Sequence, residues 1–159
     1  MKKPRLYLET SVWNFIFADD APEKREITLR FFDRIREGEY DIFISDLVID
    51  EIMRADDEKR NALLKIVGEH KPVSLAITEE SQELAEAYIS ENVLSEDNIE
   101  DVTHAAIATV NGMDALISWN LKHLANLRRM EMINVANMKM GYYKRLNLIT
   151  PMEVCNEEI

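Results

Sequence analysis

Cysteine is nearly absent from this chain of 159 residues, whose only one is Cys155. One cysteine cannot form a disulfide within the chain, so we expect a protein of the reducing cytoplasm. Long apolar runs are also missing, since none approaches the roughly 18 to 20 residues that span a bilayer. The opening MKKP has no apolar stretch behind its lysines, so we expect no export signal. These absences predict a soluble protein without a membrane partner.

Glycine is scarce as well. The four glycines form no G-x-G-x-x-G motif, which argues against a glycine-rich phosphate loop. Cys/His clusters of the kind that bind zinc, internal repeats and low-complexity tracts are also missing. Hydrophobic residues make up 47% of the chain and charged residues 31%, which is ordinary globular usage. A chain of this length can bury one core, so we expect a single domain over residues 1–159.

The charge is strongly asymmetric along the chain. The net charge is −11, which is unusual for a protein that binds phosphates through lysine and arginine. Residues 121–147, however, hold six basic side chains against the single acid Glu131, a net charge of +5. The six are Lys122, Arg128, Arg129, Lys139, Lys144 and Arg145. They form either a solvated helix face that balances the acidic body or, with Tyr142 and Tyr143, a surface for single-stranded nucleic acid or an acidic protein.

Short β-type runs alternate with longer helical ones. Strands are predicted at residues 5–8, 41–45, 73–77, 114–118 and 147–150. Helices are predicted at about 22–38, 46–55, 57–68, 79–91, 97–110 and 125–140. Alternation of strands and helices with short connections favours a mostly parallel sheet covered on both faces. The expected fold class is therefore α/β, as a three-layer α/β/α sandwich.

Polar side chains follow three of these strands. They are Glu9, Thr10 and Ser11 after the first, Ser45 and Asp46 after the second, and Trp119 and Asn120 after the fourth. The ligand crevice of an open parallel sheet lies beyond the carboxyl ends of its strands, so these groups are predicted to share one rim. Serine, threonine and aspartate also favour helix N-caps, and taken singly they could do no more than that.

Two further acids are predicted to point inward. At 100° per residue, Glu51 falls between Leu47 and Ala55, inside the apolar stripe of its helix. Asp101 shares with His104 a helix face floored by alanines. An inward carboxylate is unfavourable unless it is paired or binds a cation, so each acid alone could form a satisfied salt bridge. Together with the acid after the first strand, they suggest a pocket.

A pocket with three carboxylates indicates a divalent cation. Like charges a few ångströms apart raise one another's pKa, and a cation relieves that repulsion. Oxygen ligands with retained water suit Mg²⁺ or Mn²⁺ rather than zinc. Such ions activate water and stabilise charged oxygens when a phosphodiester is cut. The residues therefore predict metal-dependent phosphoryl hydrolysis.

Five segments carry a resemblance to a known family. They are YLETSV, SDLVIDEI with Glu51, NIEDVTHAAIA with Asp101, DALISWNLKHLAN from Asp114 to Asn126, and ITP near the end. In this order and spacing the chain resembles the PIN-domain ribonucleases, particularly the VapC-like toxins of type II toxin-antitoxin pairs. The resemblance covers almost the whole chain and implies one PIN-like domain.

The resemblance implies a set of site residues. Glu9, Glu51 and Asp101 would bind the metal, with Asn120 as a fourth catalytic position and with Thr10, Ser11, His104 and His123 in support. Glu9 and Asn120 stand where aspartate is commonest in the family. The loss of one charge at Asn120 favours one bound metal over two. From the residues alone, His104 could equally be a satisfied core histidine, and His123 a turn cap.

The resemblance also implies a function and partners. The expected activity is cleavage of single-stranded RNA by a water molecule that Mg²⁺ or Mn²⁺ activates, with Lys122, Arg128 and Arg129 binding RNA. Expected partners are a small antitoxin protein and a second copy of the chain, which would form a homodimer through helices within residues 22–68. Three alternatives stay open: a catalytically weakened PIN-like module that binds RNA or protein, an unrelated doubly wound binding protein, and a DNA nuclease.

Overall fold

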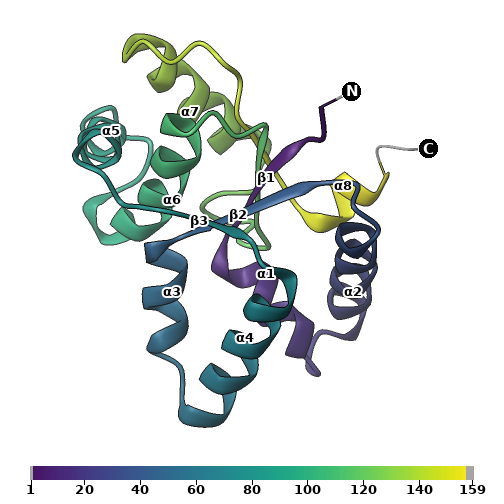
Figure 1. Ribbon diagram of the computed structural model, residues 1–159. Coiled ribbons are helices and arrows are strands. Elements are labelled where there is room, and N and C mark those ends of the chain that lie inside the picture. Colours follow the sequence, from purple (N-terminus) through teal and green to yellow (C-terminus); the bar gives the residue numbers. More distant parts are fainter. Residues whose placement is uncertain (1, 157–159) are drawn as a thin grey trace.

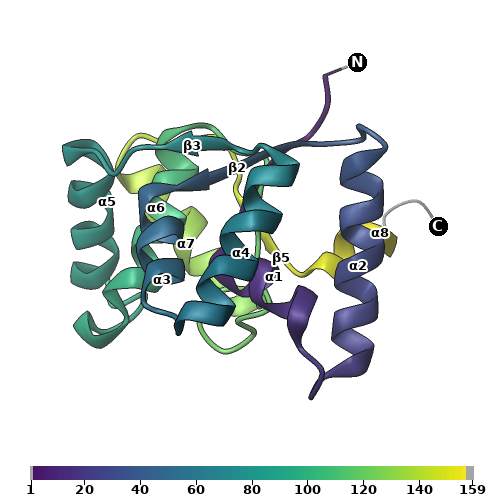
Figure 2. The ribbon, with the colours of Figure 1, turned by 60° about the horizontal axis from the view of Figure 1, so that its bottom comes forward.

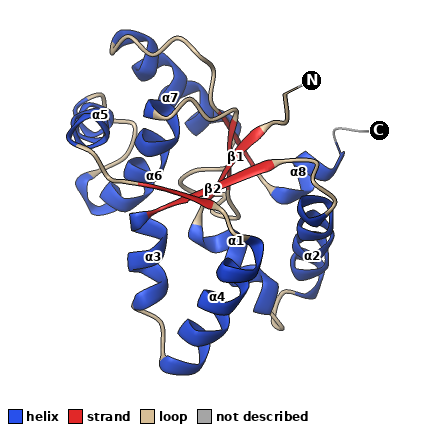
Figure 3. Ribbon diagram, in the orientation of Figure 1, coloured by secondary structure: helices blue, strands red, loops and turns tan. Residues whose placement is uncertain are grey.

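The computed structural model describes residues 2–156, in which five parallel strands form one sheet with the order β3-β2-β1-β4-β5 (Figures 1 and 3). The strands are β1 (Arg5–Leu8), β2 (Asp41–Ser45), β3 (Val73–Leu75), β4 (Ala115–Ile117) and β5 (Asn147–Ile149). β1 lies at the centre, where Leu6 pairs with Ile42 of β2 on one side and Ala115 of β4 on the other. The sheet is thus entirely parallel, a stricter arrangement than the sequence predicted.

Helices cover both faces of this sheet. They are α1 (Thr10–Asn14), α2 (Pro22–Arg36), α3 (Asp46–Met53), α4 (Asp57–His70), α5 (Glu79–Ser90), α6 (Ile99–Val110), α7 (Leu127–Lys139) and α8 (Pro151–Asn156), with 3-10 turns η1 (Phe15–Phe17) and η2 (Glu96–Asn98). In Figure 1, α5, α6 and α7 gather on one side of the strands, with α2 and α8 on the other. Figures 1 and 2 both show α3 and α4 side by side. The predicted α/β/α sandwich is confirmed.

Polar side chains cap the starts of α3 and α4. The Ser45 hydroxyl accepts a hydrogen bond from the backbone N–H of Val48, and the Asp56 carboxylate accepts one from that of Lys59. The six predicted helices and five predicted strands are all present, although β3, β4 and β5 are one or two residues shorter at their ends than predicted. The helices α1 and α8 were not predicted, because five or six residues are too few to show a helical period.

The central strands are buried on both faces because helices lie on each. Tyr7 and Leu8 of β1 and Leu116 and Ile117 of β4 are fully buried. The chain leaves β1 toward β2 on one side of the sheet and leaves β4 toward β5 on the other. Their carboxyl ends therefore form a topological switch point, the place where open α/β sheets bind ligands. No helix within residues 2–156 is long and apolar enough to span a membrane.

Candidate active site

The predicted site residues converge at this switch point. Glu9 directly follows β1, and its backbone N–H donates to the Ile117 carbonyl of β4, so it stands where the two strands separate. Glu51 comes from α3, which follows β2, and Asp101 comes from the first turn of α6. Asn120 follows β4 by three residues. Four segments that are distant in sequence thus deliver polar side chains to one place.

Two serine hydroxyls hold the Glu9 carboxylate. Ser11 Oγ donates to Glu9 Oε1 at 2.5 Å, and Ser118 Oγ donates to the same oxygen at 2.7 Å. The serines are themselves fixed, because Trp119 N–H donates to Ser11 Oγ and Asn120 N–H donates to Ser118 Oγ. Glu9 is only 7% exposed, yet Oε2 accepts no hydrogen bond from residues 2–156. One oxygen is anchored and the other is left available to a ligand.

The Glu51 carboxylate is anchored in the same way. Thr10 Oγ1 donates to Glu51 Oε1 at 2.6 Å, and His104 Nε2 donates to it at 2.7 Å. Burial raises the pKa of Glu51, but the hydrogen bonds and charge from His104 outweigh it, so the pKa lies below its usual value. The Glu51 side chain keeps 21% of its surface exposed. It is therefore a partly buried carboxylate that stays ionised.

His104 is fully buried and bonded through both ring nitrogens. Its Nδ1 lies 2.6 Å from the hydroxyl of Tyr7, which lies 2.7 Å from Ser45 Oγ. Burial raises the pKa of Tyr7 above its usual range, so the phenol keeps its proton. Both interpretations of His104 from the sequence hold in part, because it is a satisfied core residue that also donates to a carboxylate.

Asp101 is half-buried beside Asn120. Asn120 Nδ2 donates to Asp101 Oδ1 at 3.2 Å, while Asn120 Oδ1 accepts from the backbone N–H of His123 at 3.1 Å. Burial and then the charge of Glu9 raise the pKa of Asp101 above its usual value. The carboxylates of Asp101 and Glu9 therefore repel one another as like charges, as predicted. The alanine floor of α6 is confirmed by fully buried Ala105.

The donor set suits a divalent cation. Polar atoms of Glu9, Glu51 and His104 all lie within 4.8 Å of one another. Of these, the two carboxylates are the candidate ligands, because His104 donates its Nε2–H to Glu51 and bonds Tyr7 through Nδ1. Asp101 is not a member of this group, and its Oδ1 accepts a hydrogen bond from Asn120. In the described part of the chain, no lysine or arginine forms an ion pair with the three carboxylates. Carboxylates crowded without a lysine or arginine partner fit an oxygen-bound cation such as Mg²⁺ or Mn²⁺. The ligand roles of the three acids stay predictions.

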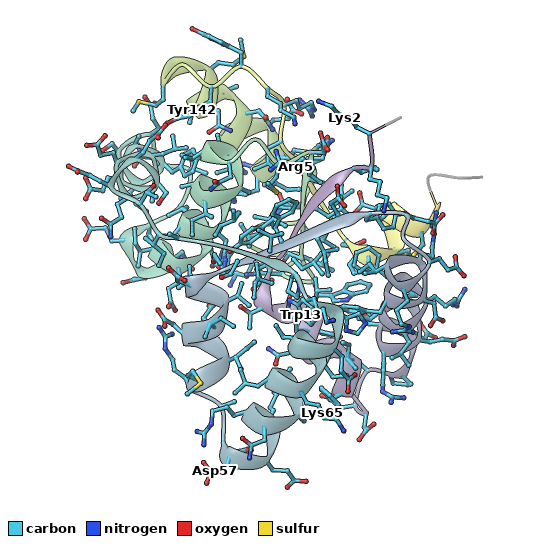
Figure 4. The ribbon with its side chains drawn as sticks, viewed as in Figure 1. Lys2, Arg5, Trp13, Asp57, Lys65 and Tyr142 are labelled. Atoms are coloured by element: carbon cyan, nitrogen blue, oxygen red, sulfur yellow. The ribbon has the colours of Figure 1, made fainter. Side chains whose placement is uncertain are left out.

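The basic segment is largely occupied by ion pairs. Lys139 pairs with Glu91 at 3.1 Å, Lys144 with Asp114 at 3.0 Å and Arg145 with Glu131 at 2.6 Å. The Tyr142 hydroxyl donates to Glu80, and Figure 4 shows Tyr142 well away from Trp13 of α1. These residues therefore form a solvated, ion-paired face rather than a free cationic surface.

Three basic residues nearer the site behave differently. Lys122 and Arg128 are exposed, and no ion pair holds them within residues 2–156. Arg129 is half-buried and donates from Nη1 to the Val93 carbonyl, and burial and neighbouring Arg128 lower its pKa. Trp119 is buried and donates from Nε1 to Thr28 Oγ1. Lys122 and Arg128 are thus the exposed members of the three predicted RNA contacts, and their RNA-binding role stays a prediction.

Two site residues were missed in the sequence. Ser118 ends the fourth predicted strand and was assigned only to that strand, although it binds Glu9. Its position directly before Trp119 and Asn120, on the predicted rim, was the available signal. Tyr7 lies inside an apolar strand and is indistinguishable from a core residue by pattern. Nothing in the sequence indicated that its hydroxyl meets His104.

Comparison with known proteins shows the fold. No protein-family model matches the chain, and no curated protein matches it by sequence. Among solved structures, VapC20 of Mycobacterium tuberculosis, described as a sarcin–ricin loop cleaving toxin, is 14% identical with a TM-score of 0.56 over 74% of this chain and 92% of that one. VapBC2 from Rickettsia felis, bound to a promoter DNA fragment, is 15% identical with a TM-score of 0.54 over 92% and 98%.

The class that the fold defines is the PIN-like α/β/α sandwich. Within that class, the two solved structures are of VapC20 and VapBC2, so the chain has a VapC-like PIN fold. The resemblance found in the sequence segments is thereby confirmed at the level of fold. Identities of this size carry no residue roles or substrates from those proteins to this chain.

Proposed function

We propose that the protein is a metal-dependent endoribonuclease that cleaves single-stranded RNA, as the toxin of a toxin-antitoxin pair. The observation that carries the proposal is that carboxylate oxygens of Glu9 and Glu51 lie within 4.8 Å of one another at the switch point, where the charge of Glu9 also raises the pKa of Asp101, and that none of the three acids pairs with a lysine or arginine within residues 2–156. Such a set is unfavourable in a protein that does not use it, because like charges are held together in a half-buried place. The VapC-like fold supports the same reading.

Each carboxylate has a defined part in this proposal. Glu9 and Glu51 would hold the ion through the oxygens that the serines and Thr10 leave available, and Asp101 would complete the site. The bound Mg²⁺ or Mn²⁺ supplies an activated water and stabilises charge on the phosphate. Asn120 holds the Asp101 carboxylate through its amide and ties it to the turn at His123.

The substrate surface is proposed around the turn after β4. Lys122 in this turn and Arg128 in the first turn of α7 are exposed cations close in sequence to Asn120. Phosphates of an RNA strand would pair with them, and the acidic remainder of the chain would limit unspecific binding. A single-stranded substrate can bring a phosphate to the rim, whereas a regular duplex presents a stiff cylinder.

Incubation of purified protein with labelled RNA tests the proposal. Single-stranded RNA and a sarcin–ricin loop RNA, the target named for VapC20, are incubated with Mg²⁺, Mn²⁺ or a chelator. Glu51→Gln and Asp101→Asn remove one charge each, and Asp50→Asn is the matched control on the exposed face of α3. The proposal is supported if cleavage needs metal and is lost in Glu51→Gln and Asp101→Asn but not in Asp50→Asn. Intact RNA under every metal contradicts it.

The second candidate is a catalytically weakened PIN-like module that binds RNA or protein. The observation that favours it is Asn120, an amide that occupies Asp101 Oδ1 where the family commonly has a further acid. Asn120→Asp distinguishes the two functions. Gain of cleavage by this variant over an inert wild type would support the binding module, whereas an active wild type would exclude it.

The proposed function also implies protein partners. The VapBC2 structure is bound to a DNA fragment from its promoter. We propose a small antitoxin as a partner of this chain. We also propose a homodimer, although the apolar residues predicted to form it are mostly core: Phe31, Phe32, Ile35 and Leu63 are buried. Expression of the protein in the cytoplasm of a host cell is expected to arrest growth. The arrest should be relieved by Glu51→Gln or by co-expression of a small protein encoded beside this one.

A further inference from the structure

A buried chain of hydrogen bonds leads from the middle of the sheet to the candidate metal site. Ser45 Oγ lies 2.7 Å from Tyr7 Oη, which lies 2.6 Å from His104 Nδ1, and His104 Nε2 lies 2.7 Å from Glu51 Oε1. Val48 N–H donates to the serine at its far end. The chain joins residues from β1, β2, α3 and α6.

The direction of the hydrogen bond between His104 and Glu51 follows from the charge of the carboxylate. An ionised carboxylate can only accept hydrogen bonds, so His104 Nε2 carries the hydrogen and donates it to Glu51. The Tyr7 hydroxyl then bonds the other nitrogen of the imidazole ring. The two rings lie 5.7 Å apart at an angle of 60°, so Tyr7 restrains His104 by packing as well as by the hydrogen bond. The imidazole is held from both sides.

Tyr7, His104 and Ser45 are too deeply buried to contact a substrate. Tyr7, His104 and Ser45 have no exposed surface, whereas the Glu51 side chain has 21%. If these side chains only filled the core, apolar side chains would serve as well, because burying a polar group is unfavourable unless it is hydrogen-bonded. The hydrogen bonds of Tyr7 and His104 lead to Glu51 Oε1, which His104 and Thr10 both bond, and within residues 2–156 no hydrogen bond reaches Glu51 Oε2.

We propose that Tyr7 and His104 are positioning residues that orient Glu51 for the cation. The inference rests on the proposed metal-dependent function. Outer-shell partners that fix ligand orientation typically change metal affinity by about 10- to 100-fold when removed. His104 lies three residues after Asp101 on α6, so the same helix face carries one proposed ligand and the partner that aims another. A shift of α6 would therefore alter both together.

Tyr7→Phe is the sharpest test because it removes one oxygen and keeps the ring. The matched control is Tyr88→Phe, since Tyr88 is equally buried on α5 and bonds Asn137 and Thr109, away from the site. Mn²⁺ affinity of the RNA-free protein is measured by electron paramagnetic resonance for both variants and the wild type. We expect binding about 10-fold weaker in Tyr7→Phe and unchanged in Tyr88→Phe.

Cleavage kinetics provide the second readout. In Tyr7→Phe, half-maximal activity should need about 10-fold more metal, excess metal should restore kcat, and the KM for RNA should stay unchanged. If Tyr7→Phe does not fold, His104→Gln, which keeps one N–H for Glu51, and His104→Leu, which keeps none, replace it. The glutamine variant should then bind Mn²⁺ more tightly than the leucine variant.

The outcomes separate this inference from the function on which it rests. A wild type that binds no Mn²⁺ overturns the proposed function. Wild-type binding with equal affinity in Tyr7→Phe overturns the positioning role alone. Equal weakening in Tyr7→Phe and Tyr88→Phe also overturns it, because loss of any buried phenol would then have the same effect. Weakening confined to the Tyr7 variant supports it.

Discussion

Neutralising Asp101 is expected to stabilise the metal-free protein. Burial and the charge of Glu9 raise the pKa of Asp101, so the ionised carboxylate is less favourable in the folded chain than in the unfolded one. Stability is then fully present below the unfolded pKa of about 3.9 and is lost as pH rises through the folded pKa. At pH 7 the whole unfavourable contribution is present, and Asp101→Asn removes it.

The structure sets the size of this effect. The introduced amide keeps a carbonyl oxygen that can accept from Asn120 Nδ2, so no buried hydrogen bond is lost. Substitutions that improve charge interactions commonly gain about 0.5–2 kcal/mol. For a chain of this length, each kcal/mol raises Tm by about 2–4 °C.

Metal should reverse the order of stability. A ligand that binds only the folded state at 100 times its Kd stabilises the protein by about 2.7 kcal/mol. The wild type should gain this stabilisation, whereas Asp101→Asn, with one ligand charge fewer, should gain much less. The variant is then more stable than the wild type in chelator and less stable in saturating Mg²⁺ or Mn²⁺.

Thermal unfolding at pH 7 with chelator or metal measures both differences. Asp97→Asn is the matched control, because Asp97 is an exposed acid one turn earlier on the same approach to α6. Its Tm should follow that of the wild type under both conditions. A lower Tm of Asp101→Asn in chelator, or equal gains from metal in variant and wild type, would refute the reasoning.

Three further predictions concern salt, acid and the core. Replacing Lys122 and Arg128 with glutamine should weaken RNA binding and reduce the slope of log affinity against log salt by about 1–2, measured by fluorescence anisotropy. Burial raises the pKa of Asp114, but the N–H of Arg5 and a nearby lysine lower it below its usual value. Its stabilisation is therefore present above about pH 4 and lost as pH falls through the folded pKa, and Asp114→Asn should flatten acid unfolding followed by circular dichroism. Leu116→Ala, in the buried centre of the sheet, should cost about 2–5 kcal/mol in urea unfolding.

Local patterns were sufficient to predict where the acids of the candidate site lie. Glu51 could be placed on the inner face of α3 because the helix starts at a capped residue, Ser45, and its phase follows at 100° per residue. Asp101 could be placed because alanines on its face require close packing. Parallel strands then bring both to the rim where Glu9 follows β1. Periodicity and topology together gave the position of the site.

Long-range partners could not be predicted. Arg145 pairs with an acid 14 residues away and Lys139 with an acid 48 residues away. No local sequence pattern indicates such pairs. The Tyr7 hydroxyl meets a histidine 97 residues later. Such contacts depend on how α6 and α7 settle against the sheet, which sequence periodicity leaves open. Side-chain pairing therefore had to come from the structure.

The most direct test of the account is a crystal structure grown or soaked with Mn²⁺ and measured at the manganese absorption edge. The account predicts an anomalous peak within coordination distance of carboxylate oxygens of Glu9 and Glu51, with Asp101 turned toward it directly or through water. An occupied site elsewhere on the protein, or no peak at the carboxyl ends of β1 and β4 under saturating Mn²⁺, would contradict it.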